Sequence, residues 1–422
     1  MTAASQASQP PSAVWRTPVV IILCACGIAM LSYGPRSALG LFMMPLSQSN
    51  GWTLSIFSAA LAIQNLLWGL AQPIAGGLAD KYGATRVLSA SALLYAAGLV
   101  LTAYSTTPLM VGLSAGVMVG LALAGSSFSL VIGALGKLLP PEWRMFAFGA
   151  GTAAGSFGQF LFSPMAVALT DEIGWQGALI IFAGLLMFIL PLSLALAMPR
   201  ARARSPDQPA IDQQSAKQAL VEAFGHRSYI LLVAGFFTCG FQLAFVTAHL
   251  QAYLLLKGLP AYVGGWTMAV IGLFNIVGAL SAGWLSSRVP KRYVLSVIYF
   301  GRALAVLIFV LLPPSPAAAL VYGAITGLLW LSTIPPTNGL VLVMFGTRWL
   351  AMLSGVAFVS HQIGGALGVW LGGIVVSSYG SYDPVWWLSI VFGVLSAIIN
   401  LPIVEKPVPR LAAQAARDKA TP

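Results

Sequence analysis

Two short basic stretches decide the fold of this 422-residue sequence: Gly77-Leu78-Ala79-Asp80-Lys81-Tyr82-Gly83-Ala84-Thr85-Arg86 and, 206 residues later, Gly283-Trp284-Leu285-Ser286-Ser287-Arg288-Val289-Pro290-Lys291-Arg292. Both open with glycine and both form a tight basic turn. Each follows the second apolar run of one half of the chain, and the second copy lacks the aspartate. The two stretches therefore indicate an internal repeat.

The segments around these turns are long and apolar. The chain is 58% hydrophobic and 7% charged, with a mean hydropathy of +0.88, whereas about a quarter of a soluble domain is charged. A helix needs about 20 apolar residues to cross the hydrocarbon. The sequence predicts an all-α membrane protein with twelve transmembrane helices in two six-helix halves. The expected spans are 18–41, 53–76, 87–104, 108–131, 147–169, 177–198, 229–254, 262–285, 293–312, 317–343, 350–376 and 384–403.

One long hydrophilic stretch divides the chain. We expect an N-terminal six-helix bundle over 1–198, a linker over 199–228, a C-terminal six-helix bundle over 229–404 and a tail over 405–422. The first apolar run is too long for the core of a signal peptide and no A-x-A-type cleavage site closes it. We expect it to remain as a spanning helix.

Positive charges alternate between the two sides of the predicted membrane. The chain has 21 Lys and Arg against 10 Asp and Glu, and cytoplasmic loops carry the excess of cations in membrane proteins. The expected outer loops hold Lys257 as their only cation. The pattern predicts a multi-pass protein of the plasma membrane, specifically of a bacterial inner membrane. Both termini and the linker are expected to be cytoplasmic. The orientation of the protein in a lipid bilayer explains the excess of Lys and Arg over Asp and Glu, so no nucleic-acid partner is expected. The cations assigned to the inner side are Lys81, Arg86, Lys137, Arg144, Arg200, Arg202, Arg204, Lys217, Arg227, Arg288, Lys291, Arg292, Arg348, Lys406, Arg410, Arg417 and Lys419.

Few ionisable side chains lie inside the predicted spans. All ten acids fall in loops or tails, so no intramembrane carboxylate is expected to bind a cation or carry a proton. His249 and His361 are the histidines in the spans, neither beside a carboxylate, and the chain has no G-x-x-x-x-G-K-[ST] nucleotide loop. We therefore expect no enzyme, no catalytic residue, no metal and no cofactor. Cys24, Cys26 and Cys239 lie in apolar runs and are expected to form no disulfide.

The first basic turn reads G-x-L-A-D-K-x-G-x-x-R and resembles the signature loop between helices 2 and 3 of the major facilitator superfamily. With the repeat and the central loop, this resemblance covers nearly the whole chain. It implies alternating access, in which two halves rock about a site near the middle of the membrane. It also implies that the turn is a conformational latch in which Asp80 pairs with a basic group; the alternative is a solvated turn. The implied latch residues are Gly77, Asp80, Lys81, Gly83 and Arg86, with Arg144 as a partner.

A finer resemblance is to the monocarboxylate transporters and oxalate/formate exchangers. It is carried by Gly34-Pro35-Arg36-Ser37-Ala38-Leu39-Gly40-Leu41-Phe42 with Pro45, by His249-Leu250 with Tyr253, and by the stretch from His361-Gln362 to Gly380-Ser381-Tyr382-Asp383. It implies a secondary active carrier of a small, monocarboxylate-like organic anion, coupled to protons or to anion exchange. Monocarboxylate transporters place a substrate-binding Arg in helix 8, four residues after an acid or Asn. This chain has Asn275 and Ala279 there, which argues against lactate-like substrates and leaves Arg36 as the anion anchor.

Three ionisable residues are the main site candidates. Arg36 is expected in the outer part of the bilayer, and its planar charged fork suits a carboxylate; it could instead snorkel or bind a carbonyl freed by Pro35. His249 is expected to bind substrate and, with His361, to carry the coupling proton. Alternatively, either histidine could be neutral and have a structural role. Arg302 is expected near a helix end, where it can snorkel.

Four further residues are expected to line the site, namely Gln242, Asn275, Tyr33 and Trp330. Gln242 lies 206 residues after Arg36, so the two are expected to face each other across the repeat axis. The amides could instead bridge helices, and the aromatic residues could be packing. Two other functions stay open, an exporter of larger apolar or amphipathic compounds and a transporter-like sensor. The substrate, the direction of transport, the coupling ion and the oligomeric state also stay open.

Overall fold

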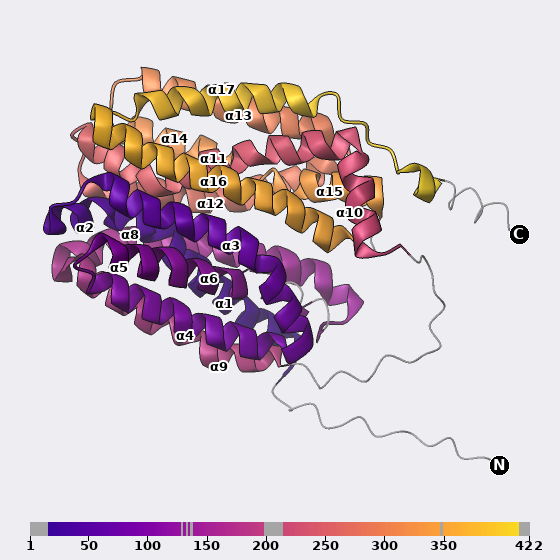
Figure 1. Ribbon diagram of the computed structural model, residues 1–422, viewed down its shortest axis with the longest axis horizontal. Coiled ribbons are helices and arrows are strands. Elements are labelled where there is room, and N and C mark those ends of the chain that lie inside the picture. The colour runs from indigo at the N-terminus through magenta and orange to yellow at the C-terminus, as the bar shows by residue number, and fades with distance from the viewer. Residues whose placement is uncertain are drawn as a thin grey trace, which may run out of the picture.

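The computed structural model describes residues 16–127, 130–131, 134–135, 138–197, 214–346 and 349–412, and its regular elements there are all helices (Figure 1). Eleven helical segments among them are long and apolar enough to cross a membrane. One of these, Ala150–Leu196, has 47 residues and turns at Gly174, where φ is 77° and ψ is 164°. Since about 20 residues cross the hydrocarbon, this segment supplies two spans. The predicted all-α membrane fold with twelve spans is thereby confirmed.

The helices fall into two sets along the chain. The first set is α1 (Pro18–Ala38), η1 (Leu39–Phe42), α2 (Met43–Asn50), α3 (Leu54–Tyr82), α4 (Ala84–Ala103), α5 (Pro108–Val111), η2 (Gly112–Met118), α6 (Val119–Gly125), α8 (Pro141–Leu186), α9 (Ile189–Ser193) and η3 (Leu194–Leu196). The second set is α10 (Ala216–Gly225), α11 (Arg227–Leu256), α12 (Ala261–Ser286), α13 (Lys291–Leu311), α14 (Pro316–Leu329), α15 (Ile334–Phe345), α16 (Leu350–Tyr379) and α17 (Asp383–Asn400). The short helix α10 lies within the predicted linker.

Two spans are composite. The first span joins α1, η1 and α2 into 33 residues, Pro18–Asn50, so it ends nine residues beyond the predicted run, which stops at residue 41. The span Pro316–Phe345 is interrupted between α14 and α15, at residues 330–333. Such breaks inside a membrane are tolerated where other protein groups satisfy the freed backbone.

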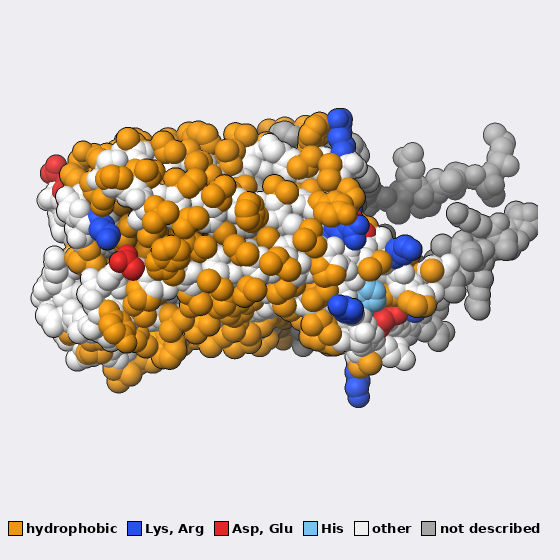
Figure 2. Space-filling model, turned by 90° about the horizontal axis from the view of Figure 1, so that it is seen from above, with side chains coloured by type: hydrophobic (Ala, Val, Ile, Leu, Met, Phe, Trp, Pro, Cys, Tyr) orange, Lys and Arg blue, Asp and Glu red, His pale blue; other side chains and the backbone are white. Residues whose placement is uncertain are grey.

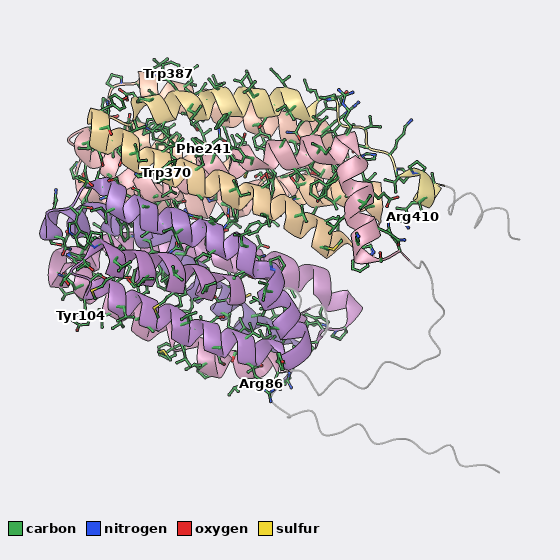
Figure 3. All side chains as sticks on the ribbon, viewed as in Figure 1. Arg86, Tyr104, Phe241, Trp370, Trp387 and Arg410 are labelled. Atoms are coloured by element: carbon green, nitrogen blue, oxygen red, sulfur yellow. The ribbon has the colours of Figure 1, made fainter. Side chains whose placement is uncertain are left out.

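The two ends of the bundle differ in charge. Figure 3 places Arg86 and Arg410 at one end, here called the basic end, and Tyr104 and Trp387 at the opposite end, here called the far end. In the space-filling view, Lys and Arg side chains gather mainly at the basic end, and a broad hydrophobic belt covers the length between the ends (Figure 2). This distribution matches a protein that spans a bilayer with its cations on one side.

The halves meet along two helix pairs, α3 with α16 and α8 with α12, and Figure 1 shows α3 beside α16. Near the far end, η1 packs on α11 so closely that a Cβ on Gly40 would lie 2.1 Å from the carbonyl oxygen of Thr247. Midway along α3, a Cβ on Gly69 would lie 2.6 Å from Cβ of Gln362. Glycine is required at both positions because no side-chain atom fits there.

The contact between α3 and α16 does not continue to the basic end. Gly76 and Gly355 each lie two helical turns from the Gly69–Gln362 contact, on the same helix faces. A Cβ added to either glycine would meet nothing within 4 Å. Along α3 and α16 the halves are therefore in close contact toward the far end and lack such contact at Gly76 and Gly355, toward the basic end.

Candidate functional site

Arg36 lies inside the bundle near the middle of the first span. It is the nineteenth of the 33 residues in the first span and is 8% exposed. Its Nη2 donates to Oδ1 of Asn65 on α3 at 2.8 Å, and its guanidinium lies 4.9 Å from the ring centre of Trp68. The first span continues to Asn50, so Arg36 is central in that span rather than near its outer end. Among the described residues the Arg36 hydrogen bond goes to the Asn65 amide rather than to a carbonyl freed by Pro35, and a side chain only 8% exposed does not fit snorkelling.

Buried donors without hydrogen-bond partners surround this guanidinium. Nε of Arg36, Nε1 of Trp68, the hydroxyl of Tyr95 and the hydroxyl of Ser32 have none among the described residues. Ser32 is one turn before Arg36 on α1, and Tyr33 and Tyr95 are near enough to interact electrostatically with the guanidinium. A buried unpaired donor is costly, so several together mark a place where an acceptor can bind.

A hydrogen-bonded chain connects Arg36 to the second half. The backbone carbonyl of Asn65 accepts from Nε2 of Gln362 on α16 at 3.1 Å. Oε1 of Gln362 is 2.9 Å from Nδ1 of His361. Because that amide oxygen only accepts, Nδ1 carries the proton. Arg36 and His361 are thus linked through Asn65 and Gln362.

His361 sits among aromatic rings and one thiol. Its ring stacks on Phe358 with centroids 5.4 Å apart and an interplanar angle of 10°, and it lies 5.0 Å from the ring of Phe236. The thiol of Cys239 is near enough to interact with it, and its Sγ is 3.2 Å from Oγ1 of Thr333. The histidine is only half-buried, so it can reach water or a ligand between the halves.

His249 lies elsewhere, in tight packing near the far end. It is 0% exposed, with Nε2 2.8 Å from the carbonyl of Val369 and Nδ1 2.9 Å from the hydroxyl of Tyr382. Nε2 therefore carries the proton and Nδ1 accepts one. Burial raises the pKa of the Tyr382 phenol, which keeps its proton to donate. Both ring nitrogens of His249 have hydrogen-bond partners, as expected for a neutral histidine with a structural role.

The other predicted lining residues are not brought to Arg36 by any described contact. Gln242 donates through Nε2 to the carbonyl of Ser389 on α17 at 3.0 Å, inside its own half. Asn275 is fully buried. Its Nδ2 donates to Ser156 at 2.9 Å and its Oδ1 accepts from the backbone N–H of Leu331 at 3.0 Å. It thus bridges α12 to α8 and to the interrupted span.

Arg302 is a second buried arginine, which we expected to snorkel at a helix end. That expectation was wrong, because it is the twelfth of the 21 residues of α13 and is 3% exposed. Its Nε donates to the carbonyl of Leu329 at 3.0 Å, and its Nη2 donates to the carbonyl of Trp330. These carbonyls lie at the break between α14 and α15. Arg302 therefore caps the break, and Trp330, only 1% exposed, is part of it.

The predicted latch can be placed only in part. The surroundings of Gly77 and the side chains of Asp80, Lys81 and Arg144 lie outside what the structure describes. Gly83 ends α3 with φ of 92° and ψ of 143°, a conformation that favours glycine. Arg86 follows it as an exposed side chain at the basic end (Figure 3).

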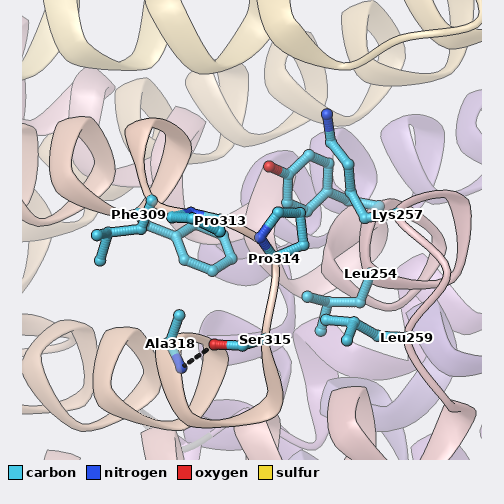
Figure 4. A pocket seen from close by; sticks show the side chains of 10 residues that line it. Leu254, Lys257, Leu259, Phe309, Pro313, Pro314, Ser315 and Ala318 are labelled. Atoms are coloured by element: carbon cyan, nitrogen blue, oxygen red, sulfur yellow. Dashed lines mark hydrogen bonds between the residues drawn. The ribbon is translucent and has the colours of Figure 1, made fainter.

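A small pocket near the far end lies between α11, α13 and α14, remote from Arg36 in the described contacts (Figure 4). Lys257 lines it, 4.0 Å from a carboxylate oxygen of Asp383 and over the ring of Tyr253 at 5.5 Å. Ser315 caps α14 there by accepting from the N–H of Ala318 at 3.1 Å. Local partners account for these polar groups, so the pocket has no chemistry comparable to the Arg36 region.

Residues 25–369 match the sequence model of the Major Facilitator Superfamily. The chain is similar to the uncharacterized MFS-type transporter YcxA of Bacillus subtilis (strain 168), with 28% identity over 402 residues, 92% of this chain and 95% of that protein. It is 26% identical over 404 residues to monocarboxylate transporter 11 of Homo sapiens, covering 91% of this chain and 82% of that protein. The crystal structure of a bacterial homolog to the human lysosomal transporter Spinster has the same fold, with a TM-score of 0.74 at 15% identity, covering 92% and 97% of the two chains. Since the family match spans most of the sequence, the protein is a multi-pass membrane transporter that belongs to the Major Facilitator Superfamily.

Proposed function

We propose that this transporter is a secondary active carrier of small, monocarboxylate-like organic anions. The observation that carries the proposal is Arg36, a buried arginine near the middle of the first span with an unpartnered Nε. A charge near the bilayer centre costs on the order of 2.5–3.5 kcal/mol by insertion scales and marks a substrate path or a paired site. Its partner here is a neutral amide, so the positive charge is left to attract an anion.

The likeness to monocarboxylate transporter 11 supports a carboxylate as the anion. Ala279 stands where monocarboxylate transporters place a second arginine, so Arg36 supplies the fork that binds the carboxylate. Tyr33, Tyr95 and Trp68 surround it. Gln242 and Trp330 act indirectly in this proposal, by holding the second half together, and Asn275 does so by bridging α12 to α8 of the first half.

The direction of opening follows from the charge distribution. We assign the basic end to the cytoplasm because cations favour that side of a bacterial inner membrane, which makes both termini cytoplasmic. The halves are then closed toward the outside, where Gly40 meets Thr247. They are separate toward the cytoplasm, where Gly76 and Gly355 meet nothing within 4 Å. The basic turn with Asp80 and Arg144 would act as the latch when this end closes.

For coupling, the geometry favours His361 over His249. His361 is half-buried and connected to Arg36 through Gln362 and Asn65, so its charge would act on the anion site. His249 has both nitrogens bonded inside closed packing, and a second proton there would break its acceptor bond. Proton coupling through His361, or anion exchange without it, is the proposed driving mechanism.

The test is transport by the purified protein in liposomes. Radiolabelled monocarboxylates should accumulate when an inward proton gradient is applied, or should exchange against an internal anion without one. Cationic amphipathic compounds should neither be carried nor compete. Export of large apolar compounds without any flux of acids would support the alternative exporter and refute the anion carrier.

A further inference from the structure

A row of aromatic side chains runs from Arg36 across the boundary between the halves. We call Trp68, Phe358, His361 and Phe236 the aromatic ladder. The Trp68 and Phe358 rings meet edge to face with centroids 5.6 Å apart, although they belong to opposite halves. Phe358 then stacks on His361 at 5.4 Å, and His361 lies 5.0 Å from Phe236. Ring surfaces therefore continue directly from the guanidinium into the second half.

The ladder lies where the contact between the halves ends. Trp68 precedes Gly69, where a Cβ would lie 2.6 Å from Cβ of Gln362, and Phe358 is one turn beyond Gln362 toward the basic end. Three residues further along, Gly355 faces open space. Trp68, Phe358 and His361 are only half-buried. A ligand that moves from the basic end toward Arg36 would pass these ring faces.

The distances limit how far the anionic group can be from the rest of the ligand. The guanidinium is 4.9 Å from the Trp68 ring centre, so a carboxylate on Arg36 has the ladder within about one ring width. The guanidinium fork can donate to the two carboxylate oxygens through Nε, which is unpartnered, and through Nη2 once Asn65 turns away, and the unpartnered Nε1 of Trp68 is a further donor nearby. A ligand that fits has one carboxylate and, a few bonds away, a flat apolar body.

Resting on the proposed function, we propose that the preferred substrates are aryl monocarboxylates. Arg36 binds the carboxylate, and Trp68, Phe358 and His361 contact the aromatic ring in edge-to-face and stacked geometry. Such ring pairs are worth about two- to tenfold in binding each, beyond the apolar area they bury. The ladder thus distinguishes an aromatic ring from a saturated ring of the same size.

Matched ligands test this directly. The dissociation constants of phenylacetate, cyclohexylacetate and acetate are measured by calorimetry on the purified full-length protein. Phenylacetate should bind about five- to tenfold more tightly than cyclohexylacetate, although the saturated ring is the more hydrophobic, and acetate should bind most weakly. Phe358→Leu keeps an apolar side chain but removes the ring. It should raise the dissociation constant of phenylacetate several-fold and leave that of cyclohexylacetate within twofold.

The control variant is Phe392→Leu, because Phe392 is a half-buried phenylalanine of α17 that contacts Phe237 and Phe241, outside the ladder. It should leave the phenylacetate preference unchanged. Equal or tighter binding of cyclohexylacetate, or an equal loss for both acids in Phe358→Leu, overturns the aryl preference while the anion carrier stands. Failure of all three acids to bind the folded protein overturns both.

Discussion

Replacement of Arg36 tests the anion site most directly. In the proposed complex the carboxylate accepts two charge-assisted hydrogen bonds from the guanidinium fork, and a hydrogen bond to a charged group contributes about 1.5–3 kcal/mol. Arg36→Ala removes both, at least about 3 kcal/mol, which corresponds to a dissociation constant raised roughly 100-fold or more. Arg36→Lys keeps the charge but loses the fork, so about a tenfold increase is expected.

Affinity and abundance must be measured together on these variants. Binding of a radiolabelled carboxylate gives the affinity, and quantitative blotting of membranes gives the abundance. Removal of a buried charge relieves part of its insertion cost, so Arg36→Ala should be made in normal amounts. Arg288→Ala is the control, because this arginine lies over Trp284 at 4.2 Å at the basic end and should keep wild-type affinity. An Arg36→Ala protein that binds within twofold of wild type would refute the role of Arg36.

Three further predictions address coupling, opening and orientation. His361→Gln should flatten the pH dependence of uptake, whereas His249→Gln should keep that dependence and lower the melting temperature; the reverse pattern would return coupling to His249. Gly40→Ala should disfavour the state closed at the far end, since its Cβ would lie 2.1 Å from a carbonyl oxygen, and should increase the labelling, by impermeant reagents, of a cysteine introduced between the halves at that end. Gly355→Ala, where a Cβ meets nothing within 4 Å, should change neither labelling nor stability, and an equal effect of both alanines would contradict the packing argument. Lys217→Cys, on the exposed face of α10, should react only with reagents that cross the membrane, and labelling of intact cells by an impermeant reagent would reverse the proposed orientation.

The arrangement of spans could be predicted because it depends on local composition. Runs of about 20 apolar residues and the alternation of cations are properties of the sequence itself. The errors lie at boundaries. The polar residues 47–50 continue the first span to Asn50, and Arg36 is therefore near the middle of that span rather than near its outer end.

The partners of Arg36 could be predicted only in part. The sequence places Asn65 at mid-span in the second run, but it shows neither how α3 is rotated nor that an arginine on α1 reaches it. Trp68 follows Asn65 by three residues and so lies on the same helix face. A search for an amide and an aromatic residue at this spacing could have found the pair. Phe358 belongs to the other half, and its place beside Trp68 depends on how the halves dock.

The two buried arginines show why burial alone does not identify the substrate residue. Arg302 donates through Nε and Nη2 to main-chain carbonyls at the break between α14 and α15, and those carbonyls would lose their donor if it turned to a ligand. Arg36 instead donates to one side-chain amide on Asn65, which can rotate away when a carboxylate offers a stronger, charged acceptor. Asn65 also accepts from Gln362 through its backbone, so a change at Arg36 is transmitted to the other half. An arginine whose partner is exchangeable and connected to both halves can bind an anion and link that binding to rocking of the halves.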